Sequence, residues 1–146
     1  MRFDEVLRTF QQFFEREGVR YALIGGLAMQ AWGRSRMTKD VDIAVDRSSQ
    51  DRVVAFAEGL GYETLYVSEA YSNHAHADSR LGRIDFMYLA GETAERIFGA
   101  ATERPVVGDV LVPVTSPEQH LAMMKGVAMK NFPHRALFEA RMSVFS

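Results

Sequence analysis

The sequence contains no cysteine, only four prolines, and no apolar run that approaches the length of a membrane span. Without cysteine there is no disulfide framework, no thiolate zinc site and no cysteine nucleophile. A spanning helix needs about 20 consecutive apolar residues, and the opening MRFDE lacks the basic start and apolar stretch of a signal peptide. We therefore expect a cytoplasmic protein with no membrane partner.

A large excess of charge is also missing. The formal net charge is -2, from 17 basic and 19 acidic residues. This excludes a strongly basic body that grips duplex nucleic acid through its phosphates alone, although it leaves room for a local basic patch. The 146 residues suffice for a hydrophobic core, and neither a repeat nor a linker divides them, so we expect one domain over 1–146.

The spacing of apolar residues and turn formers predicts an α+β fold. Helices are expected over 3–17, 27–32, 50–60 and 93–99, with Ser48 or Ser49 as a cap and a further helix opening at Ser116-Pro117. Strands are expected over 21–24, 41–45, 62–67, 71–77, 83–89, 106–107 and 110–114. Because long helices are absent between the later strands, the sequence predicts an α/β-type mixed sheet with helices packed mainly on one face.

Two features of the first half suggest chemistry. Gly25-Gly26 joins a buried strand to a helix, where glycine permits close approach to a phosphate, or serves only as a tight turn. Asp40 and Asp42 lie one residue apart on the next strand. Residues at that spacing project from the same face, about 7 Å apart at their Cα atoms, and can converge on Mg²⁺ or Mn²⁺. The alternative is a solvent-facing strand on which acids are unconstrained.

A third carboxylate, Asp85, stands at the centre of the apolar strand over 83–89. If the two strands are neighbours, three carboxylates share one face. Their mutual repulsion would raise their pKa values, and divalent ions would remove that repulsion. Two such ions would activate an attacking hydroxyl and stabilise a leaving pyrophosphate oxygen.

The loop before the acid pair, GRSRMTK at 33–39, is rich in cations and hydroxyls. Arg36 suits a triphosphate oxygen because its guanidinium binds bidentately. It could equally pair with Asp46, and Arg34 and Lys39 could simply be solvated. Further along, His74 and His76 are spaced to share a strand face with Asp78. That pattern would suit a zinc site, but we favour an exposed strand or loop face. A third possibility is that one of the two histidines points toward the active-site face and contacts the substrate.

Taken together, GG at 25–26, GRSRMTKDVD at 33–42 and the later RIDF at 83–86 resemble nucleotidyltransferases of the DNA polymerase-beta superfamily. The similarity extends over roughly 20–130. It is nearest to the small bacterial minimal nucleotidyltransferases and the abortive-infection toxin type, and more distant to aminoglycoside nucleotidyltransferases. The resemblance implies Mg²⁺- or Mn²⁺-dependent transfer of a nucleoside monophosphate from an NTP to an acceptor hydroxyl, with release of pyrophosphate.

By matching position, the resemblance also implies roles for individual residues. Gly25 and Gly26 would cradle the phosphates, and Asp40 and Asp42 would hold the metal ions. Asp85 would be a third metal ligand or the base that takes the proton of the acceptor hydroxyl. The remaining matches would shape the triphosphate pocket or reach a phosphate: Arg36, Thr38 and Lys125.

The chain departs from the family after Lys125, where a further acidic helix is usual and the sequence reads NFPHRA at 131–136. A partner subunit or a second copy of the chain is one source of the missing contacts. A catalytically silent nucleotide-binding or toxin–antitoxin interaction module is therefore the alternative function. The acceptor, whether a protein, a tRNA or a small molecule, and the base of the NTP cannot be read from the sequence.

Overall fold

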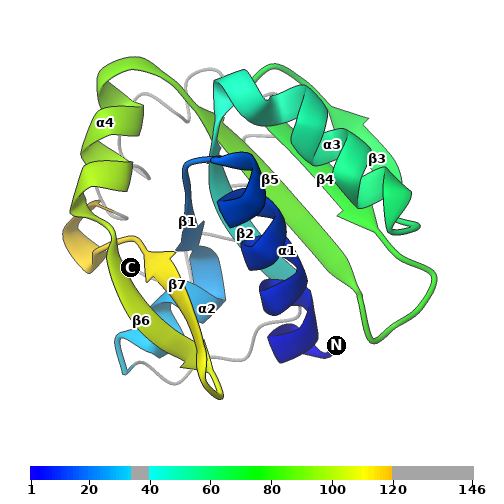
Figure 1. Cartoon of the computed structure of the whole chain (residues 1–146), viewed down its shortest axis with the longest axis horizontal. Helices are drawn as coiled ribbons and strands as arrows, with labels where there is room; N and C mark the ends of the chain where they lie inside the picture. The colour runs from blue at the N-terminus through cyan, green and yellow to red at the C-terminus, as the bar shows by residue number, and fades with distance from the viewer. Residues whose placement is uncertain (34–39, 120–146) are drawn as a thin grey trace.

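A computed structural model of the chain describes residues 1–33 and 40–119. It contains a seven-stranded mixed sheet in the order β3-β4-β5-β2-β1-β7-β6 (Figure 1). The central strand β2 pairs in parallel with β5 and antiparallel with β1, which confirms the predicted mixed sheet. The strands are β1 (Tyr21–Ile24), β2 (Asp40–Asp46), β3 (Glu63–Val67), β4 (Tyr71–Ala75), β5 (Arg83–Leu89), β6 (Thr102–Val107) and β7 (Val110–Val114).

Helices α1 (Phe3–Glu17) and α3 (Gln50–Gly59) lie over one face of this sheet (Figure 1). The apolar face of α1 is aromatic, and Phe10 packs against Phe56 of α3 and Phe86 of β5 with ring centroids 5.4 and 5.7 Å apart. Phe13 stacks on Phe56 at 4.0 Å. These phenylalanines are core residues. Gly18 ends α1 with φ 66°, a conformation that glycine adopts without strain.

The opposite face of the sheet carries a smaller buried cluster. Ala94 and Ile97 of α4 (Gly91–Ala100) belong to it, together with Ala44 of β2 and Met87 of β5. Alternate residues of a strand share a face, so Ala44 and Met87 lie on the same face as residues 42 and 85. Helix α4 therefore packs on the face of the sheet that carries the acids.

Helix α2 (Gly25–Ala31) follows β1 directly and is tied at its far end to the β6–β7 hairpin. The indole Nε1 of Trp32 donates to the carbonyl of Thr115 at 2.9 Å. The guanidinium of Arg104 lies 4.1 Å from the centre of the Trp32 ring, and its Nε donates to the carbonyl of Ala31 at 3.1 Å. These contacts fix α2 between β1 and the hairpin.

The structure corrects several predicted boundaries. The helix expected over 27–32 begins at Gly25, so the glycines form its first turn, and β4 ends at Ala75 instead of residue 77. Ser49 stands at the N-cap position of α3, as predicted, but its side chain makes no capping hydrogen bond. A 3-10 turn η1 (Arg47–Ser49) comes first, and Asp46 accepts from the backbone N–H of Ser48. At the last predicted helix, the Ser116 hydroxyl accepts from the backbone N–H of Gln119 at 3.1 Å. No helix in the described ranges is both long and apolar enough to span a membrane.

Candidate active site

Asp42 and Asp85 are direct neighbours across the parallel β2–β5 pair. The register pairs Asp42 with Asp85 and Asp40 with Arg83. Paired residues of adjacent strands point to the same face, so all three acids lie on the face opposite α1 and α3. Asp42 and Asp85 are 7% and 4% exposed, whereas Asp40 is half-buried at the start of β2.

The strand end that precedes Gly25 lies beside the acid pair, since the antiparallel register joins Ile24 to Asp42. Gly25 has φ 75°, and a Cβ placed on it would lie 2.9 Å from both Cβ and Cγ of Asp42. Real side chains do not approach so closely, so this position requires glycine for two separate reasons. Gly25, which the sequence analysis places near a phosphate, therefore lies directly against Asp42.

Tyr71 of β4 is part of the site, and the sequence analysis assigned it no role. Its hydroxyl donates to Oδ1 of Asp85 at 3.0 Å in a buried setting. The antiparallel register also places Asn73 of β4 directly opposite Asp85. Only the strand order brings β4 to this position, so nothing local in YSNHA identifies these two residues.

The predicted three-carboxylate metal site has to be restated as a site completed by the substrate. Within residues 1–33 and 40–119, no group of three or more His, Asp or Glu side chains is arranged to hold a metal ion. The acids nevertheless fit a substrate-assisted site, because Mg²⁺ is usually held by one or two carboxylates and completes its octahedron with substrate phosphates and water. The pair Asp42 and Asp85, with Asp40 next to it, provides the oxygen ligands that such an ion prefers.

Three predicted site residues, Arg36, Thr38 and Lys125, lie outside the described residues, as does the rest of the loop over 34–39. Asp46, considered as a partner for Arg36, accepts two hydrogen bonds from Arg20 at 2.7 and 2.9 Å. Although burial opposes the effect, the bonds from Arg20 and Ser48 hold the pKa of Asp46 below its usual value.

The histidine pair does not form a metal site or an exposed strand face. His74 is fully buried on the face opposite the acids, with Nδ1 3.0 Å from Thr64 Oγ1 and Nε2 2.8 Å from Ser72 Oγ. His76 lies beyond the end of β4. Its Nδ1 accepts from the backbone N–H of Asp78 at 2.9 Å, so its Nε2 carries the proton that is donated to the carbonyl of Leu60.

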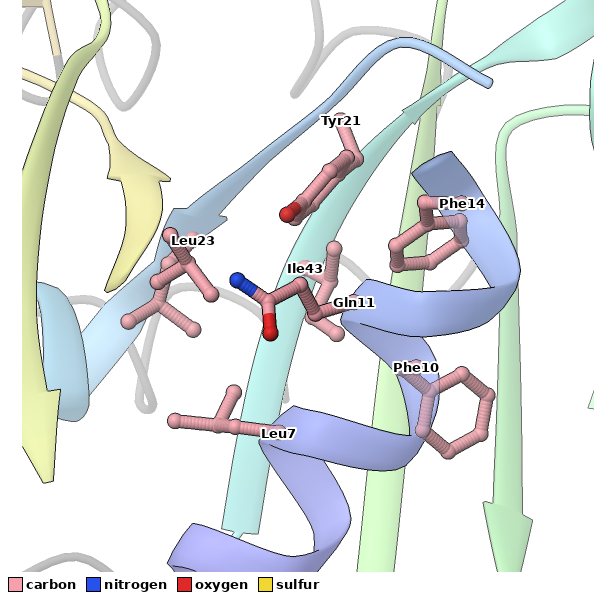
Figure 2. Close-up of a pocket in the computed structure, with 8 residues that line it drawn as sticks. Leu7, Phe10, Gln11, Phe14, Tyr21, Leu23 and Ile43 are labelled. Atoms are coloured by element: carbon pink, nitrogen blue, oxygen red, sulfur yellow. The ribbon is translucent and has the colours of Figure 1, made fainter. Parts of the chain in front are cut away.

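A small pocket opens beneath α1, on the face away from the acids (Figure 2). Apolar side chains of α1, β1, β2 and β7 line it, and the Tyr21 hydroxyl points into it beside Gln11, whose amide donates to the carbonyl of Leu111. The Tyr21 oxygen is buried and meets no hydrogen-bond partner in the described part of the chain. This pocket is a packing gap in the main core and is separate from the acid face.

The mixed sheet and its helices define the fold of the chain. The chain has the fold of the nucleotidyltransferases of the DNA polymerase-beta superfamily. The lincomycin-bound lincosamide antibiotic adenylyltransferase LnuA superposes with a TM-score of 0.61 at 16% identity, covering 97% of each chain. The antibiotic-resistance factor ANT(2'')-Ia gives a TM-score of 0.64 at 16% identity, covering 98% of this chain and 84% of its own.

A tRNA-processing enzyme also shares the fold, with a TM-score of 0.52 at 16% identity, but this chain spans only 34% of it. No protein-family model matches the sequence, and no curated protein sequence matches it. At these identities the similarity establishes the fold. The predicted toxin–antitoxin context stays a prediction.

Proposed function

We propose that the chain is a nucleotidyltransferase that moves a nucleoside monophosphate from an NTP to an acceptor hydroxyl and releases pyrophosphate. One observation carries this proposal: the in-register pair of buried acids, Asp42 and Asp85, on a sheet with the nucleotidyltransferase fold. Two buried carboxylates side by side are unfavourable unless cations or donors compensate them. Such a pair offers the oxygen ligands that divalent cations prefer, which supports a metal-dependent reaction.

Each residue of the site has a distinct task in this reaction. Asp40 and Asp42, with Asp85 as a further ligand, would hold Mg²⁺ or Mn²⁺, which supplies neutralisation of the triphosphate charge when bound. Gly25 lets the backbone lie directly against Asp42, since a Cβ at 25 would overlap the Asp42 side chain, and with Gly26 it would offer backbone amides to the phosphates. Outside the described residues, Arg36, Thr38 and Lys125 complete the proposed phosphate contacts.

In this proposal Asp85 also acts as the general base. The acceptor hydroxyl gives its proton to a carboxylate oxygen as its oxygen attacks the α-phosphorus of the NTP. The new P–O bond forms while the bond to the β-phosphate oxygen breaks, and pyrophosphate leaves with that electron pair. The hydrogen bond from Tyr71 to Oδ1 fixes the orientation of Asp85, so the carboxylate does not need to reorganise during the reaction.

The test is incubation with α-labelled NTPs, Mg²⁺ or Mn²⁺, and an acceptor panel of tobramycin, lincomycin and bulk tRNA. Lincomycin is included because the structure of LnuA contains it, and tobramycin because ANT(2'')-Ia forms a complex with adenylyl-2''-tobramycin. We expect labelled product with the wild type and none with Asp42→Asn, which keeps the volume of the side chain and removes its charge. NTP binding without transfer to any acceptor would instead identify the silent nucleotide-binding module.

A further inference from the structure

Strand β3 forms one edge of the sheet and carries exposed apolar side chains. Within residues 1–33 and 40–119 it pairs only with β4, and Figure 1 shows it at the outer side of the sheet. Leu65 and Val67 of this strand are 48% and 52% exposed. Outward backbone groups beside exposed apolar residues form a template on which another strand can pair, so proteins usually protect such edges.

The backbone of Val67 points away from β4. The N–H of Ser68 bonds to the carbonyl of Tyr71, and Val67 is paired with Ser72 in the antiparallel register. In an antiparallel pair, residues that bond to the partner strand alternate with residues whose backbone groups face outward. Because Ser68 and Tyr71 are a bonded pair, the N–H and C=O of Val67 face the outer side of the sheet. Val67 therefore presents a donor, an acceptor and an apolar side chain at one point.

The two edges of the sheet differ in their protection. Edge strand β6 contains Pro105, which has no N–H to offer to an added strand. Strand β3, with the sequence ETLYV, contains neither proline nor lysine. Its register shifts between Thr64 and Tyr66, an irregularity that limits an added strand to a short segment but removes no N–H group. Of the two edges in the described sheet, β3 is therefore the one that can accept a short strand near Val67.

Acidic side chains surround this edge and indicate the charge of its partner. Glu63 begins β3 and Glu69 follows its end, and both are exposed. The exposed Glu58 of α3 accepts from the Thr64 hydroxyl at 2.7 Å, and Arg47 lies 3.5 Å from Glu69. A second copy of the chain, related by a two-fold axis, would bring the same acids together, and like charges across paired strands are destabilising. A segment with Lys or Arg between its apolar residues would instead complement them.

We propose that the outer side of β3 is a docking site for a short extended segment of a partner protein, in which apolar residues alternate with Lys or Arg. The segment adds an eighth strand to the seven-stranded sheet. Its backbone bonds to that of Val67, its apolar side chains pack on Leu65 and Val67, and its cations lie near the acids. No residue of the acid face takes part, so this inference is independent of the proposed function.

The experiment measures binding of two fluorescein-labelled peptides, KVKVTVK and EVEVTVE, to the whole chain by fluorescence anisotropy. The probes share their apolar residues and differ in the sign of their charge. We expect the basic peptide to bind with a Kd at least about 10-fold lower than that of the acidic one. Val67→Lys and Leu65→Lys should each weaken its binding about 10-fold, because each removes an apolar contact and adds a like charge. Leu111→Lys is the matched control, since Leu111 is 47% exposed on β7, and it should bind like the wild type.

Amide hydrogen exchange tests the backbone pairing directly. At a saturating concentration of the basic peptide, exchange at the Val67 amide should slow by at least about 10-fold, while amides of β6 keep their rates. The inference is overturned by absence of binding, by equal affinity for the two peptides, by unchanged binding in both β3 variants, or by an equal loss in Leu111→Lys. A dimer in sedimentation that Val67→Lys dissociates would assign this edge to a second copy and would also overturn it.

Discussion

The buried histidine of β4 predicts how the fold responds to acid. His74 is 0% exposed and is enclosed by the hydroxyls of Thr64 and Ser72, and the Ser72 hydroxyl also lies 2.6 Å from that of Tyr88. Burial lowers the pKa of His74 to about 4, and the nearby carboxylate of Glu58 offsets only part of this effect. The folded protein therefore holds this ring neutral under conditions in which an unfolded chain would protonate it.

The sign and size of the effect follow from the two pKa values. An exposed histidine in the unfolded chain titrates near 6.5, so as the pH falls the unfolded state takes up the proton first. The contribution of the neutral ring is complete above about pH 6.5 and is lost as the pH falls to about 4. At about 1.4 kcal/mol per pH unit, this difference removes about 3 kcal/mol from the free energy of unfolding.

Urea unfolding at a series of pH values between about 7 and 4 measures this loss. His74→Gln retains hydrogen-bonding groups and cannot be protonated, so its free energy of unfolding should fall by about 3 kcal/mol less than that of the wild type over this range. Other acid-sensitive groups affect both proteins equally. If His74→Gln and the wild type lose stability in parallel, the assignment of a buried neutral ring is wrong.

Three further tests, two of which compare a pair of substitutions, address other parts of the structure. Gly18→Ala should lower the free energy of unfolding by about 1 kcal/mol, because position 18 has a positive φ. Gly25→Ala should lower it by clearly more, because position 25 has a positive φ and a Cβ there would also clash with Asp42. Urea unfolding of the two variants measures the difference. Tyr21→Phe should raise the free energy of unfolding by about 1 kcal/mol, because it removes a hydroxyl that has no partner in the described residues. Tyr62→Phe should lower it by a similar amount, because it loses the 2.8 Å hydrogen bond to the carbonyl of Leu81. A change of the same sign in both variants would contradict this. Tyr71→Phe should reduce nucleotidyl transfer about 10-fold with little change in the KM for NTP, since it releases the third acid from its fixed orientation, and unchanged kcat would count against that role.

Local patterns were sufficient for most of the elements. The aromatic spacing of 3–17 and the stop at Gly18 predict α1, and alternation over 83–89 predicts β5 with the bounds that the structure shows. The strands expected on either side of Gly108 form the antiparallel β6–β7 hairpin, with φ 59° at the glycine. The boundaries that failed, such as the start of α2, depend on backbone hydrogen bonds that residue preferences do not specify.

Local patterns were not sufficient for the histidines. His74 and His76 have the spacing of a shared strand face, and polar residues of that kind are mostly exposed. Strand β4 ends between the two histidines. The ring of His74 contacts the hydroxyls of Thr64 on β3 and Ser72 on β4, and the Ser72 hydroxyl contacts that of Tyr88 on β5. Burial here comes from segments distant in the sequence, so no window around residue 74 could have revealed it.

By itself, the sequence determined that Asp40 and Asp42 share a face and that a glycine turn precedes them, because strand periodicity and glycine conformation are local properties. Tertiary structure alone decided which strands became neighbours. The parallel register of β2 with β5 set Asp85 beside Asp42, and the antiparallel register of β4 with β5 brought Tyr71 and Asn73 to the same place. Strand order and register arise from packing across the whole sheet, so a site assembled from three strands becomes visible only once the sheet has formed.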